Sequence, residues 1–214
     1  MPATIIDGAR VANTILAQTH QRASDIVTAL GRRPCLATVL VGEDPASHTY
    51  VRMKTNRCCT TGLDSRSHHL AASTTTGEAV ALVRALSEDP GVDGILVQHP
   101  MPAHVDERAV FEAIAPGKDV DGVTQASFAA MALGGNGFHS CAPGGSMELL
   151  DAYEVDAAGL RAVVVGRSSI LGKPVGMLLL ARDATVTCCH SKLWISIRSW
   201  LRLTSSSPRS TDPN

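Results

Sequence analysis

The sequence predicts an α/β protein with two parts, a three-layer α/β domain followed by an incomplete domain of the Rossmann type. Short apolar runs alternate with stretches of helical periodicity, and this alternation is typical of a largely parallel sheet covered by helices. A glycine-rich stretch at residues 133–138 interrupts the alternation. We therefore expect domains over residues 1–138 and 139–192.

The first part contains two clear strand patterns and three helical ones. The apolar run Leu36–Val41 predicts a buried strand, and residues 44–59 predict a helix. Residues 75–87 predict a second helix, Gly94–Gln98 a second strand, and residues 105–114 a third helix. One face of the second helix carries apolar residues, namely Ala79, Leu82, Val83 and Leu86.

The second part begins with a helix and continues as one strand–helix–strand unit. Residues 145–153 predict the helix, Arg161–Gly166 a strand, Gly172–Ala181 a helix and Ala184–Cys188 a strand. Such a unit is the start of a parallel, Rossmann-type sheet.

Composition excludes several classes of function. The chain has 214 residues, 44% of them hydrophobic and 18% charged, and a formal net charge of −1. It has no basic segment and only 3% aromatic residues, which disfavours a nucleic-acid partner. No apolar run approaches the length that spans a bilayer, and no secretory signal is evident. We expect a cytoplasmic protein with no membrane partner.

The cysteine pattern argues against a zinc site or a disulfide framework. The six cysteines include two adjacent pairs and no C-x-x-C. We expect reduced thiols and no bound metal.

Tyr50 and Lys54 lie four residues apart in a predicted helix, so both side chains should share one face. A lysine beside a phenol and apolar neighbours can act as an acid or a base. The spacing also suits a solvated lysine and a boundary tyrosine, and by itself it favours that interpretation, because perturbed groups are a minority.

Two further polar residues follow a strand and a turn. Gln98 ends an apolar strand and precedes His99-Pro-Met-Pro102, and polar groups at the carboxyl end of a parallel strand often face a ligand crevice. The same residues suit an ordinary strand end with proline turns equally well. Asp121 lies in the acidic turn Lys118–Gly122. Its carboxylate could accept hydrogen bonds from a ligand or close an Asx turn before Gly122.

A glycine turn joins the strand and the helix of the second part. Its sequence, Gly166-Arg-Ser-Ser-Ile-Leu-Gly-Lys-Pro174, is neither G-x-G-x-x-G nor a P-loop. A turn at a helix start still suits phosphate, and Arg167 adds a guanidinium fork. The acid that usually binds the ribose of NAD is absent after the second strand. Arg167 with Ser191 therefore favours the 2′-phosphate of NADP.

In their order along the chain, these motifs closely resemble the bifunctional methylenetetrahydrofolate dehydrogenase/methenyltetrahydrofolate cyclohydrolase family. The resemblance covers about residues 3–192. The motifs that carry it are Tyr50-x-x-x-Lys54, Gly94-Ile-Leu-Val-Gln-His-Pro-Met-Pro102, Lys118-Asp-Val-Asp-Gly122, Val163-Val-Val-Gly-Arg-Ser-x-x-x-Gly-Lys-Pro174 and Ala184-Thr-Val-Thr-x-x-His-Ser191.

The resemblance implies an activity and a set of roles. The family oxidises 5,10-methylenetetrahydrofolate with NADP and hydrolyses the methenyl product to 10-formyltetrahydrofolate, as a homodimer. Lys54 would assist the attack of water, Gln98 would hydrogen-bond and tune Lys54, and Tyr50 would pack against the folate rings. Asp121 would anchor the pterin, with Pro100 in the substrate site. The residues expected to hold NADP are Gly166, Arg167, Ser168, Gly172 and Ser191.

The chain departs from the family pattern in three places. His99 stands where the family more often has Leu, and Ser140 where it usually has Pro. Residues 193–214 contain both tryptophans and a single acid, and do not continue the strand–helix alternation. With a choice of synonymous codons, residues 193–209 can be re-read in a neighbouring frame as the Ala-Asp-Ile-Val-type strand of the family. We therefore expect a frameshifted tail and impaired activity.

Two alternative functions stay open at this stage. One is a catalytically inactive remnant that binds folate or pairs with an intact subunit, and NADP reduction would separate it from the enzyme. The other is a phosphate-binding protein that uses Gly172-Lys173. The loop spacing is wrong for a P-loop, which argues against it.

Overall fold

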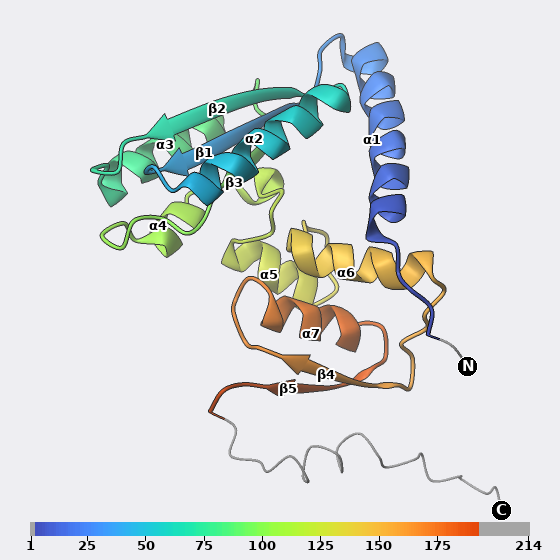
Figure 1. The fold of residues 1–214 in the computed structure, drawn as a ribbon. Coiled ribbons are helices and arrows are strands. Elements are labelled where there is room, and N and C mark those ends of the chain that lie inside the picture. Colours follow the sequence, from blue (N-terminus) through green and yellow to red (C-terminus); the bar gives the residue numbers. More distant parts are fainter. Residues whose placement is uncertain (1–2, 193–214) are drawn as a thin grey trace, which may run out of the picture.

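The computed structural model describes residues 3–192, and the tail at residues 193–214 lies outside this described part. The chain is an α/β protein, as predicted. Figure 1 shows two groups of elements, one built on β1, β2 and β3 and the other containing β4 and β5. Helix α1 (Gly8–Leu30) runs alongside both groups, from its start near α6 to the first sheet.

The first sheet has three parallel strands in the order β2-β1-β3. Strand β1 (Cys35–Val41) lies between the polar edge strand β2 (Asp64–Leu70) and β3 (Gly94–Val97). Helix α2 (Pro45–Thr60) and helix α3 (Thr76–Glu88) lie on opposite faces of this sheet (Figure 1). The predicted three-layer domain is therefore confirmed.

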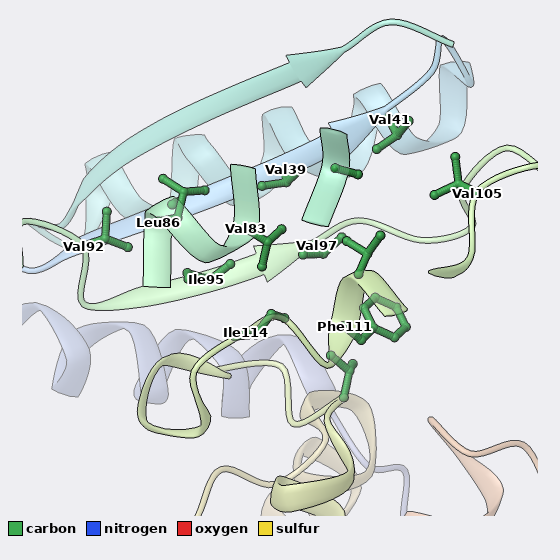
Figure 2. Close-up of a cluster of buried hydrophobic side chains, with 14 residues drawn as sticks. Val39, Val41, Val83, Leu86, Val92, Ile95, Val97, Val105, Phe111 and Ile114 are labelled. Atoms are coloured by element: carbon green, nitrogen blue, oxygen red, sulfur yellow. The ribbon is translucent and has the colours of Figure 1, made fainter. Parts of the chain in front are cut away.

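The main hydrophobic core lies on the α3 face of this sheet. Alternate residues of β1 point into it, and Val39 and Ile95 have no exposed surface. Figure 2 shows these side chains packed against Val83 of α3 and, at the other side of the cluster, against Phe111. The apolar face predicted for α3 is confirmed, because Ala79, Val83 and Leu86 are buried and Leu82 packs against the same cluster.

Several elements differ from the sequence-based predictions. Helix α1 and strand β2 were not predicted, since α1 buries only Val11 and Ala23 of its 23 residues and β2 is largely polar and exposed. The helix predicted over 105–114 is wrong in length. Its helical part is α4 (Glu107–Phe111), which Asp106 caps, and the 3₁₀ turn η1 (Pro116–Lys118) follows it.

The second group consists of three helices and a two-stranded parallel sheet. Helix α5 (Gln125–Ala132) was not predicted, and α6 (Cys141–Ala152) begins four residues before the predicted start. Its first turn contains Pro143. Proline usually breaks a helix but is tolerated in the first turn. The predicted strand–helix–strand unit is confirmed as β4 (Arg161–Val165), α7 (Gly172–Leu180) and β5 (Thr185–Cys189).

A small cluster of Met131, Met147 and Leu178 joins α5, α6 and α7. Helix α5 thus packs within the second group although it precedes residue 138, so the boundary placed there stays a prediction. Among residues 3–192 no helix is both long and apolar enough to cross a membrane.

Candidate active site

Helix α2 presents Tyr50 and Lys54 to one pocket, as their spacing predicts. The helix begins with Pro45, and the Asp44 carboxylate accepts a hydrogen bond of 2.8 Å from the backbone N–H of Ser47. That bond holds the pKa of Asp44 below its usual value and favours the helix start. The side chain of Tyr50 is 57% exposed, which leaves its ring open to a ligand.

Gln98 reaches Lys54 from the carboxyl end of β3. The backbone N–H of Gln98 donates to Val39 at 2.8 Å, which continues the sheet ladder by one residue. Its side-chain amide donates to the carbonyl of His99 at 2.7 Å, so its Oε1 faces Lys54. The Nζ of Lys54 donates to that oxygen at 3.3 Å. The lysine is thus oriented by a buried amide.

A pocket of about 450 Å³ surrounds this pair. The four residues predicted to be catalytic, Tyr50, Lys54, Gln98 and Asp121, all line it. Its other lining residues are Leu96, His99, Cys141, Ala142, Ile170 and Leu171. The structure therefore gathers residues of both groups of elements around Lys54.

The loop that carries Asp121 is organised by Asp119, which is fully buried. The Asp119 carboxylate accepts hydrogen bonds from the backbone N–H groups of Val123 (3.1 Å) and Thr124 (2.9 Å) and from the hydroxyl of Ser127 (2.6 Å). Asp119 therefore stabilises the acidic turn, a task that the sequence also allowed for Asp121. Asp121 instead faces the pocket. The KDVDG motif indicated an acidic turn but not which aspartate stabilises it.

Cys141 adds a neutral thiol to the pocket. Burial of the thiol, followed by the nearby charge of Asp121 and a hydrogen bond to it, raises the pKa of Cys141 to about 12. Its Sγ donates to the carbonyl of Val120 at 3.3 Å. Cys141 as a whole residue is exposed, so the burial that raises the pKa is that of its sulfur atom. The sequence reasoning did not single out this residue.

The glycine turn after β4 is closed by its own backbone. Gly166 has φ +135°, and a Cβ on Gly172 would lie 2.6 Å from the carbonyl carbon and oxygen of Gly166. The hydroxyl of Ser168 accepts hydrogen bonds from the backbone N–H groups of Leu171 (3.1 Å) and Gly172 (3.2 Å). Only glycine fits at Gly172, because a side chain would open the turn.

Arg167 and Ser191 lie at the same edge of the second sheet. Strands β4 and β5 are parallel and in register from Arg161 with Thr185 to Val165 with Cys189, so the residues that follow each strand share one edge. Arg167 is exposed, and within residues 3–192 no acidic side chain forms an ion pair with it. A guanidinium in this setting is suited to a phosphate.

The other sequence-predicted residues differ in their relation to the pocket. Pro100 follows a cis peptide bond after His99, and it is exposed and does not line the pocket. Gly166, Arg167 and Ser168 are outside the pocket lining, but the same turn places Ile170 and Leu171 in it. In the described part of the chain, no cluster of three or more His, Cys, Asp or Glu residues could hold a metal ion.

Comparison with protein families assigns both parts of the chain. Residues 6–121 match the family model described as tetrahydrofolate dehydrogenase/cyclohydrolase, catalytic domain, and residues 140–198 match its NAD(P)-binding domain. The first match ends at Asp121, and the second begins at Ser140, just before α6.

Individual relatives give the same result. The chain is 62% identical over 192 residues to the "bifunctional protein FolD 1" of Salinispora arenicola, covering 90% of this chain and 69% of the relative. A second relative with this description, from Streptomyces avermitilis, is 61% identical and is covered to 66%, with 89% of this chain. The chain thus spans about two thirds of the length of these relatives.

A solved structure supports the fold over the same span. The methylenetetrahydrofolate dehydrogenase-cyclohydrolase of Trypanosoma brucei, solved with NADP cofactor and an inhibitor, superposes with a TM-score of 0.85 at 35% identity. The match covers 90% of this chain and 66% of that one.

Proposed function

The chain belongs to the tetrahydrofolate dehydrogenase/cyclohydrolase family, and we propose that it acts on folate substrates in both reactions of that family. These are the oxidation of 5,10-methylenetetrahydrofolate with NADP and the hydrolysis of the methenyl product to 10-formyltetrahydrofolate. The observation that carries the proposal is the contact of Lys54 with Gln98 inside a pocket that Tyr50 and Asp121 also line.

Each pocket residue has a task that suits its position. The exposed ring of Tyr50 offers a flat apolar face for the folate ring system, and the carboxylate of Asp121 can accept hydrogen bonds from ring N–H groups of the pterin. Lys54, oriented by Gln98, is placed to exchange a proton with a water molecule near the reacting carbon. We assign Pro100 to the outer part of the substrate site, because it follows Gln98 and His99.

The two reactions balance as follows. The methylene carbon loses a hydride and becomes a cationic methenyl carbon between the two folate nitrogens. Water then adds to that carbon and loses a proton, and the bond from the carbon to N5 breaks with protonation of N5, which leaves the formyl group on N10. Lys54 is the one lysine in the pocket lining, and we place it in the second reaction, in moving the proton of the attacking water.

The second sheet suits a dinucleotide with a 2′-phosphate. The closed turn from Gly166 to Gly172 lies at the edge that Arg167 and Ser191 share, just before the start of α7, and an arginine beside a helix start suits phosphates. NADP, when bound, supplies the acceptor for the hydride. The residues we assign to it are Gly166, Arg167, Ser168, Gly172 and Ser191.

We also propose a cytoplasmic homodimer. All six cysteines are free thiols, as expected in a reducing compartment. Helix α1 exposes several large apolar side chains, for example Leu30 at 65% and Ile26 at 39%, and such surfaces often mark subunit contacts. Light scattering of the purified chain should report twice the mass of one chain, and a monomer at micromolar concentration would contradict this proposal.

Replacement of Lys54 tests the proposed function. We expect Lys54→Met to lower methenyltetrahydrofolate hydrolysis at least about 100-fold, because it removes the acid–base group, while folate affinity changes little. Arg52→Met is a matched control, since Arg52 is an exposed cation on the same helix and does not line the pocket. Equal hydrolysis by the Lys54→Met variant and the parent chain would exclude the role of Lys54.

An assay of NADP reduction, together with a folate-binding measurement, separates the enzyme from the inactive remnant. We expect the chain to reduce NADP slowly when methylenetetrahydrofolate is added, in keeping with the impaired activity expected from the sequence. Folate binding without NADP reduction or methenyl hydrolysis would instead favour a folate-binding remnant.

A further inference from the structure

Two side chains from the start of α6 hold the loop on either side of Asp121. The hydroxyl of Ser140 donates to the carbonyl of Gly122 at 3.0 Å, and the thiol of Cys141 donates to the carbonyl of Val120 at 3.3 Å. The two acceptors are the carbonyl groups of the residues immediately before and after Asp121. Consecutive side chains therefore hold the peptide unit just before this aspartate and the one that follows Gly122.

The two backbones touch at this point. Gly122 has φ +63°, and a Cβ built on it would lie 2.5 Å from the backbone nitrogen of Ser140 and 2.5 Å from the carbonyl carbon of His139. Ser140 itself is only 2% exposed. Gly122 and Ser140 are both buried, so loss of the hydroxyl would leave the Gly122 carbonyl without this partner.

The opposite side of the loop is already rigid. Asp119 binds the backbone N–H groups of Val123 and Thr124, which fixes the segment that follows Gly122. The direction of the Asp121 side chain then depends on how its two neighbours, Val120 and Gly122, are held. Cys141 binds the carbonyl of Val120, and Ser140 binds the carbonyl of Gly122.

We propose that Ser140, together with Cys141, is a positioning residue that aims the Asp121 carboxylate into the folate pocket. The inference rests on the proposed function, because the ligand of Asp121 is assigned there. The hydroxyl is a feature of this chain, since a proline, which the family resemblance leads one to expect at this position, has no hydrogen-bond donor. The Ser140 backbone (φ −52°) is also open to proline, so the hydroxyl and not the backbone shape is the difference.

Hydrogen exchange tests the positioning without any ligand. In Ser140→Ala, amide exchange in the segment 119–124 should accelerate relative to the parent chain. Ser146→Ala is the matched control, because the Ser146 hydroxyl bonds within α6, to the carbonyl of Ala142 at 3.1 Å, and does not touch the loop. Unchanged exchange in Ser140→Ala would overturn the proposal, whatever the binding results.

Folate binding tests what the positioning does. We expect Ser140→Ala and Cys141→Ala each to raise the Kd for 5-formyltetrahydrofolate about fivefold, the usual effect of one lost hydrogen bond. Cys141→Ser, which keeps a donor, should restore most of the affinity. The Ser140 effect should vanish in an Asp121→Ala background, since a residue that acts only through Asp121 has nothing left to position.

The outcomes separate this proposal from the proposed function. A fivefold loss that persists in the Asp121→Ala background would overturn the positioning role and leave folate binding intact. If the parent chain does not bind 5-formyltetrahydrofolate, the proposed function fails, and the role toward folate fails with it even if hydrogen exchange responds.

Discussion

The two sheets of this protein differ in how well they are covered. The first sheet has helices on both faces, and Ile95 at its centre is completely buried. Within residues 3–192 the second sheet has two strands and one covering helix, α7, and Val165 at its end is 74% exposed. The buried cluster beside the first sheet contains fourteen residues, whereas that of the second group contains three, within the described part of the chain.

The difference in packing between the two sheets matters for the two parts of the site. Lys54 and Gln98 must hold one geometry for acid–base chemistry. Gln98 directly follows β3 of the densely packed first sheet, and Lys54 lies on α2, which covers that sheet. The glycine turn instead depends on hydrogen bonds within the turn itself, such as those that the Ser168 hydroxyl accepts from the backbone N–H groups of Leu171 and Gly172. Stability and site geometry should therefore respond differently to changes in the two groups.

The largest expected effect is on the reactivity of Cys141, at the contact between the two groups. Only the thiolate reacts. Raising the pKa of the thiol from 9.0 to about 12 lowers the fraction of thiolate at pH 8 about a thousandfold. We expect iodoacetamide to label Cys141 far more slowly than Cys59, although both residues are exposed. Mass spectrometry of timed samples measures the two rates, and equal rates would mean that the thiol is not enclosed.

The next effect compares the two cores directly. Ile95→Ala should lower the free energy of unfolding by about 4 kcal/mol, and Leu178→Ala, in the smaller cluster, by about 2 kcal/mol. Urea unfolding followed by circular dichroism measures both. A larger loss for Leu178→Ala would reverse the comparison between the two groups.

A smaller effect concerns an ion pair at the start of β1. Arg32 binds both carboxylate oxygens of Asp93 at 2.7 Å, and the backbone N–H of Cys35 donates to Asp93 as well. The Arg32 hydrogen bond, helped by that of Cys35, holds the pKa of Asp93 below its usual value. A depressed pKa stabilises the fold above the unfolded value of about 3.9, and this stability is lost as the pH falls through the folded value.

Asp93→Asn should therefore cost about 1 kcal/mol at pH 7, because both side chains are about 40% exposed and solvent screens the pair. The cost should shrink as the pH falls below about 4. In the second group the Asp151–Arg182 pair has similar geometry, but the Asp151 side chain is 55% exposed, so Asp151→Asn should cost less. Unfolding at several pH values measures both, and a constant cost of Asp93→Asn down to pH 2 would contradict the assignment.

The smallest effect is expected on the open end of the second sheet. Val165→Thr should change the free energy of unfolding by less than about 0.5 kcal/mol, because the side chain is mostly exposed. Val97→Thr, at a buried position of the first sheet, is the control and should clearly destabilise the protein. Similar losses for the two variants, measured by thermal unfolding, would show that Val165 is covered in solution.

Local patterns predicted much of the fold and little of how the site is held together. The apolar strands β1 and β3 and the face of α3 were readable because buried side chains impose a period on the sequence. Strand β2 was not readable, since its sequence DSRSHHL is polar and pairs only along one edge of the sheet. The start of α6 was predicted too late, because proline usually breaks helices and Pro143 lies in the first turn of this one.

The sequence by itself determined that Tyr50 and Lys54 share a helix face and that a glycine turn begins α7, because both depend on residues close in the chain. Tertiary structure alone decided that Gln98, 44 residues from Lys54, meets it, and that Cys141 binds the loop of Asp121. These contacts depend on the way in which the chain returns through a helix after each strand, so that the ends of parallel strands meet at one edge of a sheet. No local pattern specifies the distance between residues that the chain joins by such crossings.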